Sequence, residues 1–331
     1  MSRGLVRIAI VVAVLAAVPL VVTSNTVLNF LIVALLIALV GQGWNVLGGY
    51  GGQYSFGHAA FFGTGAYVTA VLQVRYGVNA WAAFVLAIAA GALIGAAIGY
   101  LTFRTGLKGS YFALVTLAFA EVLRIIASVA PITGAGVGTL VRLDLRPEVF
   151  QFQSRAAFYW VLLALLAASL LVVHAIAHSR FGARLVAVRE NEDAAAALGV
   201  DALLVKLGAM TVSAAITAAG GGFYVQYFLF VDAGIAYGPW ISVEALLTAI
   251  IGGVGTVFGP LLGALVVKSL GEIAKLATGD APGLDLVIYG AVLIVVVRFA
   301  PHGLAGALGD ARAWLMRRVG WRTAPGDHDH G

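Results

Sequence analysis

Cysteine is missing from this chain of 331 residues, which excludes a disulfide framework, a thiolate nucleophile and a cysteine-ligated metal site. Charge is also scarce, because only 11% of the residues are charged, whereas a soluble domain has about 25%. Hydrophobic residues make up 61% of the chain, which is more apolar side chain than one globular core can bury. The composition therefore predicts that a lipid bilayer surrounds most of the protein.

Catalytic motifs are also lacking. The sequence has no HExxH, CxxC or nucleophile-elbow motif, and none of its lysines follows a glycine, so it has no phosphate-binding loop of its own. We therefore predict that the chain is not an enzyme and that it uses no metal and no cofactor.

Apolar runs occupy most of the chain. A membrane-spanning helix needs about 20 apolar residues, and the runs lie near residues 5–22, 26–46, 57–74, 80–102, 110–130, 156–177, 207–231, 241–252, 256–275 and 284–300. The segment 241–252 is too short to cross alone. The first run is expected to stay as a helix, with a cleaved signal peptide as the alternative. We predict one all-α, polytopic membrane domain over residues 1–331, with about 8–10 transmembrane helices.

The loops between the runs predict an orientation, because cytoplasmic loops are enriched in Lys and Arg. If the N-terminus is cytoplasmic, the inner side receives the larger set: Arg3, Arg7, Arg104, Lys108, Arg180, Arg184, Arg189, Lys206, Arg312, Arg317, Arg318 and Arg322. Both termini, the loop 178–206 and an amphipathic tail over 302–331 then lie in the cytoplasm. The largest outer connection, 131–155, is either a docking surface for an external protein or a plain connector.

Two glycine-rich stretches interrupt the apolar runs, one at 48–65 (GGYGGQYSFGHAAFFGTG) and one at 252–265 (GGVGTVFGPLLGAL). Glycine costs a helix about 1 kcal/mol relative to alanine, so these stretches predict unwound backbone that packs against protein. Paired broken segments are typical of internal repeats in transporters, although chance similarity of glycine-rich sequence is the alternative. Gly91, Gly95 and Gly99, four residues apart, predict a face where another helix approaches closely.

Polar residues inside the apolar runs are candidates for a substrate path, since burying them in lipid is costly. They are Gln53, Ser55, His58, Glu121 and Glu244. Three of them have a structural alternative: Glu121 pairs with Arg124 to fix a helix rotation, His58 is a hydrogen-bonded packing residue, and Glu244 caps a helix.

The longest break in apolarity runs from Ser179 to Lys206 and reads SRFGARLVAVRENEDAAAALGVDALLVK. Acidic residues followed by alanines and a glycine predict a short helix with acid in its first turn and a left-handed end at Gly199. Within it, Asp193-Ala194-Ala195 and Gly199 form the pattern DAAxxxG, which resembles the EAAxxxG loop of permeases from ATP-driven (ABC) importers. Asp replaces Glu here, and the Leu-Pro pair that usually follows is absent.

The resemblance extends over roughly residues 40–300 and is closest to LivM-type permeases, which import branched-chain amino acids. GGYGGQYSFGHAAFFGTGAYVTAVL, GSYFALVTLAFAEVLRIIA and ALLTAIIGGVGTVFGPLLGA also match that family. It implies a bacterial inner-membrane subunit that works with a second related permease, two cytoplasmic ATPases and an external substrate-binding protein. It also implies a coupling helix that docks on the ATPase, with the residues Arg189, Glu190, Asp193, Ala194, Ala195 and Gly199.

Two alternative functions remain at this point. The expected cargo is a small zwitterion with an aliphatic side chain, because apolar walls and helix ends at the two breaks suit it. The alternative is that the same machinery carries urea, short amides or other amino acids. A more distant alternative is an ion-coupled secondary transporter, which the scarcity of buried acids disfavours.

Overall fold

The computed structural model describes residues 3–278, 287, 290–291, 303–304 and 306. Its long helices are α1 (Arg3–Val21), α2 (Asn25–Trp44), α3 (His58–Tyr76), α4 (Ala80–Arg104), α5 (Gly109–Val129), α6 (Arg155–Ala177), α7 (Arg180–Glu190), α9 (Ala202–Phe228), α11 (Pro239–Gly252) and α12 (Gly259–Thr278). Shorter helices are the π-helix η1 (Asn45–Tyr50), the 3-10 turns η2 (Pro131–Thr133), η3 (Ala135–Val137) and η4 (Pro147–Val149), α8 (Glu192–Ala197) and α10 (Ala233–Ala236). The predicted helix at 284–300 and the amphipathic tail at 302–331, apart from these few positions, lie outside the described residues.

The all-α, polytopic fold class is confirmed. Within the described residues, 7 segments are long and apolar enough to cross a membrane. The short predicted segment 241–252 corresponds to α11, and together with α10 it forms a 20-residue segment of this kind. The helices α3 and α12 form where apolar runs were predicted but are not among the seven, because glycine and polar side chains dilute α3 and charged ones interrupt α12.

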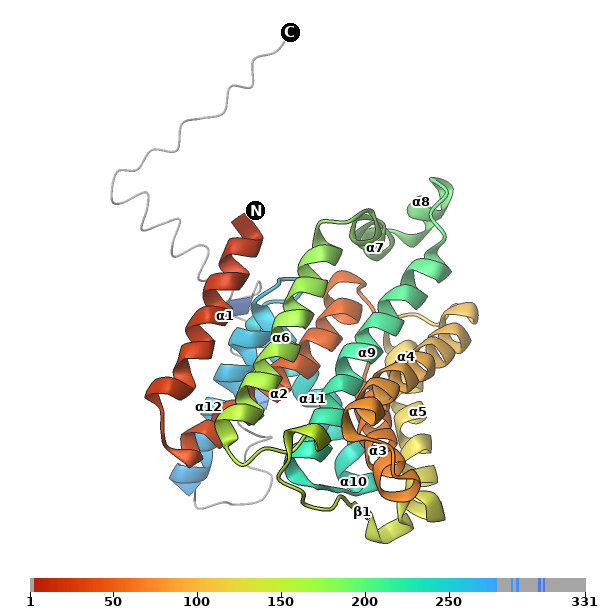
Figure 1. Cartoon of the computed structure of the whole chain (residues 1–331). Coiled ribbons are helices and arrows are strands. Elements are labelled where there is room, and N and C mark those ends of the chain that lie inside the picture. The colour runs from red at the N-terminus through yellow and green to blue at the C-terminus, as the bar shows by residue number, and fades with distance from the viewer. Residues whose placement is uncertain (1–2, 279–286, 288–289, 292–302, 305, 307–331) are drawn as a thin grey trace, which may run out of the picture.

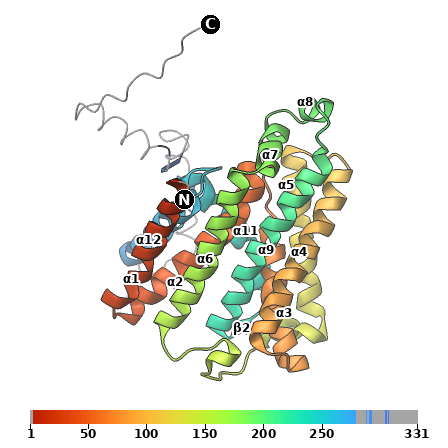
Figure 2. The ribbon, with the colours of Figure 1, turned by 45° about the horizontal axis from the view of Figure 1, so that its top comes forward.

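The long helix α9 packs between α3 and α4 on one side and α2 on the other, while α1 lies at the edge of the bundle against α6 (Figures 1 and 2). The predicted glycine face of α4 is confirmed as a close contact with α9. A Cβ atom on Gly91 or Gly95 would overlap the side chains of Ala218 and Ala214. Small residues therefore let these two backbones approach more closely than larger side chains would allow.

The bundle has two distinct ends (Figure 1). The start of α1 lies at the same end as α7 and α8, and the small sheet lies at the opposite end. That sheet pairs β1 (Thr139–Leu140) with β2 (Phe230–Val231) in antiparallel register, Thr139 opposite Val231 and Leu140 opposite Phe230. We call the two ends the coupling end and the sheet end. The predicted inner loops that the structure describes lie at the coupling end; its cytoplasmic location stays a prediction.

The connection 131–155 folds against the sheet end. Phe150 is fully buried, stacks on Trp81 with ring centroids 3.9 Å apart, and meets Phe84 and Phe223 edge-on. This aromatic cluster anchors the connection to α4 and α9, so it is packed structure over part of its length.

Candidate functional site

The charged segment between α6 and α9 folds into two short helices, α7 and α8. The sequence predicts only the second of them. The Ser179 hydroxyl accepts a hydrogen bond from the Gly182 amide at 3.1 Å and caps α7. Asn191 caps α8 through the Ala194 amide at 2.9 Å, and Asp201 caps α9 through the Leu204 amide at 3.0 Å. Each cap satisfies a backbone amide that the helix itself leaves unpaired.

The helix α8 presents a small, polar surface at the coupling end. Glu192 and Asp193 lie in its first turn, where the positive end of the helix dipole favours acid. Gly199 has φ +83°, so the predicted left-handed end is confirmed. Of the predicted coupling residues in this helix, Ala195 is buried and faces the protein, whereas Asp193 and Ala194 are exposed. Exposed small and acidic residues leave room for another protein to contact α8.

Glu192 attaches α8 to the rest of the protein. Its carboxylate accepts a hydrogen bond from Lys206 Nζ of α9 at 2.6 Å and lies 2.9 Å from Lys108 Nζ, in the loop between α4 and α5. Partial burial by itself would raise the pKa of Glu192, but the hydrogen bonds from the two lysines hold it below its ordinary value. The Lys206 side chain is only 5% exposed, so its ion pair with Glu192 is shielded from solvent. Glu192 thus fixes α8 to α9 and to the loop between α4 and α5.

Arg189 connects the same segment to the first glycine-rich stretch. Its Nη1 donates to the Gly49 carbonyl in η1 at 2.9 Å, while its Nε and Nη2 donate to Glu190 at 3.1 and 2.6 Å. The methylene groups of Arg189 cross directly over Gly52, which has φ +65° and where a Cβ atom would overlap Arg189 Cγ. The end of α7 is therefore in direct contact with the break between α2 and α3.

The two glycine-rich stretches contact each other. Asn45, at the start of η1, accepts a hydrogen bond from the Gly255 amide at 2.8 Å and donates one to the Thr256 carbonyl at 2.9 Å. Gln42, one turn earlier, donates to the Val257 carbonyl at 2.6 Å. Side chains of α2 thus hold the backbone between α11 and α12, which provides partners for unwound backbone at membrane depth.

The non-helical residues 51–57 lie between η1 and α3 and are supported by neighbouring helices. Trp44 Nε1 donates to the Ser55 carbonyl at 2.9 Å, and the Ser55 hydroxyl accepts from the Gly57 amide at 3.0 Å. The amide of Phe56 donates to Thr116 of α5 at 3.2 Å. The predicted unwinding at this stretch is therefore present, and protein groups satisfy its backbone.

The predicted path residues lie in different surroundings. Gln53 donates to the Gly51 carbonyl at 3.2 Å beside the break. His58 is fully buried at the start of α3, with its Nε2 2.9 Å from Ser213 Oγ of α9. Glu244 is buried in α11 and accepts from Lys268 Nζ of α12 at 2.6 Å. His58 also contacts the backbone of Ser55, another predicted path residue. The roles of all these residues in transport stay predictions.

Glu121 is separate from that group. It pairs with Arg124 through two hydrogen bonds, Nε to Oε2 at 2.8 Å and Nη2 to Oε1 at 2.6 Å, so the predicted pairing along α5 is present. The pair lies on the outside of the described subunit, with 46% of the Glu121 side chain and 34% of the Arg124 side chain exposed.

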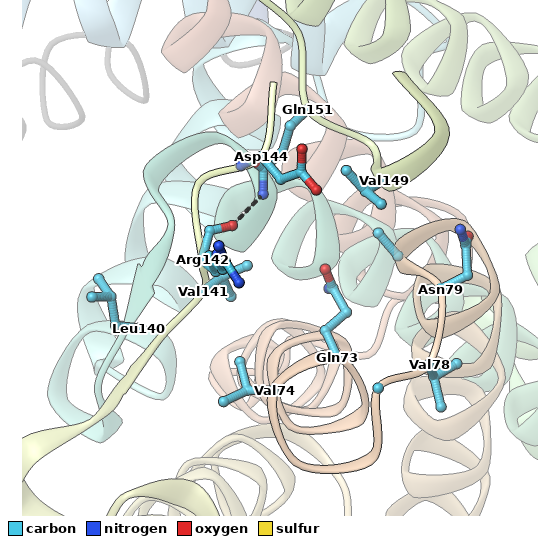
Figure 3. A pocket seen from close by; sticks show the side chains of 12 residues that line it. Gln73, Val74, Val78, Asn79, Leu140, Val141, Arg142, Asp144, Val149 and Gln151 are labelled. Carbon is cyan, nitrogen blue, oxygen red and sulfur yellow. Dashed lines mark hydrogen bonds between the residues drawn. The ribbon is translucent and has the colours of Figure 1, made fainter. Parts of the chain in front are cut away.

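A pocket of about 510 Å³ opens at the sheet end, between the end of α3, the start of α4 and the connection 131–155 (Figure 3). Gln151 holds its rim, because its Nε2 donates to the Arg142 carbonyl at 3.0 Å and its Oε1 accepts from the Asp144 amide at 2.6 Å. Arg146 pairs with Asp144 and lowers the pKa of that carboxyl. The pocket therefore combines apolar walls with polar and charged side chains, at the end opposite α8.

Comparison with known proteins identifies the class of protein. The family described as "Branched-chain amino acid transport system / permease component" matches residues 26–297. The chain belongs to this family. It is 27% identical over 312 residues to the high-affinity branched-chain amino acid transport system permease protein LivM of Escherichia coli (strain K12), covering 86% of this chain and 71% of that protein.

A probable branched-chain amino acid transport permease protein LivM of Methanocaldococcus jannaschii is 26% identical over 237 residues, covering 66% of this chain and 67% of that protein. The match to LivM of Salmonella typhimurium is similar, at 28% over 294 residues. No solved structure matches the chain significantly. The chain is thus a LivM-type, multi-pass permease of the inner membrane, and the predicted resemblance is confirmed.

Sequence reasoning missed several residues that shape this site. Glu192, Lys206 and Lys108 were not predicted to form an ion-pair cluster, and Asn45 and Gln42 were not predicted to bind the second glycine-rich stretch. The spacing between these partners runs from 14 to 215 residues. The only available signal was that Asn45 and Gln42 are amides inside an apolar run, next to a glycine-rich stretch.

Proposed function

We propose that this chain is the membrane-embedded permease subunit of an ATP-driven importer for branched-chain amino acids. A cytoplasmic ATPase dimer binds α8 and moves it, and the movement reaches the glycine-rich breaks, whose rearrangement alternates access to the substrate. The partners are two ATPase subunits, a second related permease and an external substrate-binding protein.

The hydrogen bond between Arg189 and the Gly49 carbonyl is the observation that supports this proposal most directly. It connects the end of α7, next to the exposed α8, to η1. Asn45 of η1 binds the second break, so displacement of one short helix reaches both unwound segments through two contacts. An importer needs such a connection, because the ATPase works outside the bilayer while the gate lies within it.

The cargo is proposed from the relatives and from the chemistry of the breaks. The relatives in E. coli and S. typhimurium carry the words "branched-chain amino acid" in their names. The dipoles of helices that end at unwound segments favour the charged groups of an amino acid, and apolar helices suit its side chain. The polar pocket at the sheet end and the connection 131–155 provide the surface where the substrate-binding protein docks.

Replacing Arg189 by alanine tests the coupling. A hydrogen bond from a charged group contributes about 1.5–3 kcal/mol, so its loss lowers leucine uptake per ATP hydrolysed by at least about tenfold. Arg184→Ala is the matched control, because Arg184 lies on α7 and is also exposed but makes no hydrogen bond to η1 among the residues that the structure describes. The measurement is ATP hydrolysis and leucine uptake by the complete complex in proteoliposomes, with co-purification of the ATPase subunits as a check on assembly.

Equal coupling in the Arg189→Ala and Arg184→Ala complexes would contradict the proposed connection. Leucine accumulation by the chain alone, driven by an ion gradient with no ATPase present, would contradict the function itself and favour a secondary transporter. Competition of unlabelled leucine, urea and short amides against labelled leucine separates the proposed cargo from the alternatives.

A further inference from the structure

The outward face of α5 carries a charged pair inside a membrane-spanning segment. Glu121 is 12 residues from Gly109 and 8 residues from Val129, which at 1.5 Å per residue places it about 18 Å and 12 Å from the two helix ends. Both side chains are partly exposed on the described subunit. A hydrocarbon environment offers no hydrogen-bond partner for the remaining guanidinium and carboxylate groups, so this part of α5 is not suited to face lipid.

The Arg124 side chain does not escape the hydrocarbon by extending, or snorkelling, to the membrane surface. Arg124 lies 5 residues from Val129, nearer the sheet end of α5. Its Nε and Nη2 are nevertheless bound to Glu121, one turn farther from that end. The guanidinium is therefore directed away from the nearer surface, which is opposite to the direction a lipid-facing arginine takes.

Other outer helices of the described subunit show the expected lipid-facing pattern. Away from the helix ends, the exposed side chains of α1, α4 and α6 are apolar. Val14, Leu93 and Leu171 are examples. The charged pair on α5 thus departs from this pattern. Only 22% of the membrane-spanning stretch of α5 is buried within the described subunit.

Glu121 lies in a seam along α5 whose other members are small or apolar residues. Its members alternate at spacings of four and three residues, which keeps them on one side of the helix and is typical of helix–helix contacts. They are Leu114, Ala118, Glu121, Ile125 and Ser128. Ala118 and Ser128 are small enough to let a neighbouring helix approach, and Ile125 and Leu114 supply apolar contact area.

We propose that the second, related permease subunit packs a membrane helix against this α5 seam and supplies the polar partner for the Glu121–Arg124 pair. The occupant must itself be embedded in the bilayer, because the pair lies at membrane depth, and it must offer hydrogen-bonding groups, because the pair is not fully satisfied by itself. A neutral pair selects a polar side chain or a free backbone carbonyl rather than a net charge. This inference rests on the proposed function, which supplies the second permease.

Photo-crosslinking tests the seam. The photoreactive amino acid p-benzoylphenylalanine is placed at the position of Leu114 in the seam or, as a matched control, of Leu93 on α4, since both leucines are exposed, at 62% and 71%. The complex is expressed with its second permease, irradiated in the membrane and analysed by mass spectrometry. We expect adducts with the second permease from position 114 at a yield at least ten times that from position 93.

A double substitution gives an independent measurement. Glu121→Leu with Arg124→Leu makes the face more apolar, so a lipid-facing helix would keep or improve its membrane level and its association. If α5 instead packs against the second permease, the double substitution removes the polar contact between the two subunits. We then expect the amount of co-purified second permease to fall at least fivefold while the chain stays in the membrane.

The outcomes separate the inference from the function on which it rests. Adducts from position 114 with lipid only, or with a second copy of this chain, overturn the inference, as does full retention of the second permease by the double variant. If no second permease co-purifies with the unmodified chain, the proposed function fails as well.

Discussion

Asn45 joins the two glycine-rich stretches, and its replacement by alanine is the sharpest test of that arrangement. Its side chain is fully buried. The orientation of the amide follows from its partners, because the Gly255 N–H can only donate and the Thr256 carbonyl can only accept. Alanine removes both hydrogen bonds at once and leaves both backbone groups with one partner fewer in a place that offers little water.

The magnitude follows from these two bonds. Each hydrogen bond has a net value of about 1 kcal/mol, and a buried group left unsatisfied costs about 1–3 kcal/mol. We therefore expect Asn45→Ala to lower the free energy of unfolding by about 2–5 kcal/mol. Asn29→Ala is the matched control in α2, the helix that precedes η1, since Asn29 accepts one hydrogen bond, from Tyr227 at 2.6 Å, in a partly exposed place. Its expected cost is about 0.5–1.5 kcal/mol.

The assay is unfolding of the purified chain in mixed micelles by titration with sodium dodecyl sulfate, followed by circular dichroism and tryptophan fluorescence. Leucine uptake by the complex is measured in parallel, and we expect Asn45→Ala to lose more uptake than Asn29→Ala. Equal unfolding curves for the two variants would refute the reasoning, because they would show that the contact between the two breaks contributes no stability.

Two further predictions concern the coupling end. Gly52→Ala places a methyl group against the arginine side chain that crosses it and should lower uptake and destabilise the chain by about 1–3 kcal/mol; Gly106→Ala, also at positive φ but with open space around it, should cost only about 1 kcal/mol. The pKa of Glu192 is lowered in the folded protein, so the attachment of α8 is complete above the ordinary carboxyl pKa of 4.5 and is lost as pH falls through the lowered value. A spin label at Ala197 should gain mobility over that acidic range, Glu192→Gln should make it mobile at neutral pH, and Asp193→Asn should leave the titration unchanged.

Much of the fold follows from local sequence. Apolar runs set the positions of the long helices because a spanning helix must satisfy its backbone internally. Glycine-rich composition indicated the unwound residues after η1, and Gly199 indicated the left-handed end of α8. These features depend on residues that are neighbours in the chain, so sequence reasoning could reach them.

Contacts between distant segments could not be predicted in the same way. Arg189 was assigned to the coupling loop by resemblance, but its bond to Gly49 spans 140 residues. Glu190 and Asp193 were predicted as coupling acids, whereas Glu192 between them makes the contacts with lysines. From the sequence alone, any of these three acids could pair with Lys206, because all three lie within four positions. The way α8 packs against α9 decides which one does.

The strand pair at the sheet end has a consequence for α11. Because β1 is bonded to β2, and β2 leads directly through α10 into α11, the outer connection is tethered to the N-terminal end of α11. The opposite end of α11 runs into the glycine-rich stretch held by Asn45 and Gln42. One 14-residue helix is consequently restrained at both of its ends, so a displacement at either end is transmitted to the same helix.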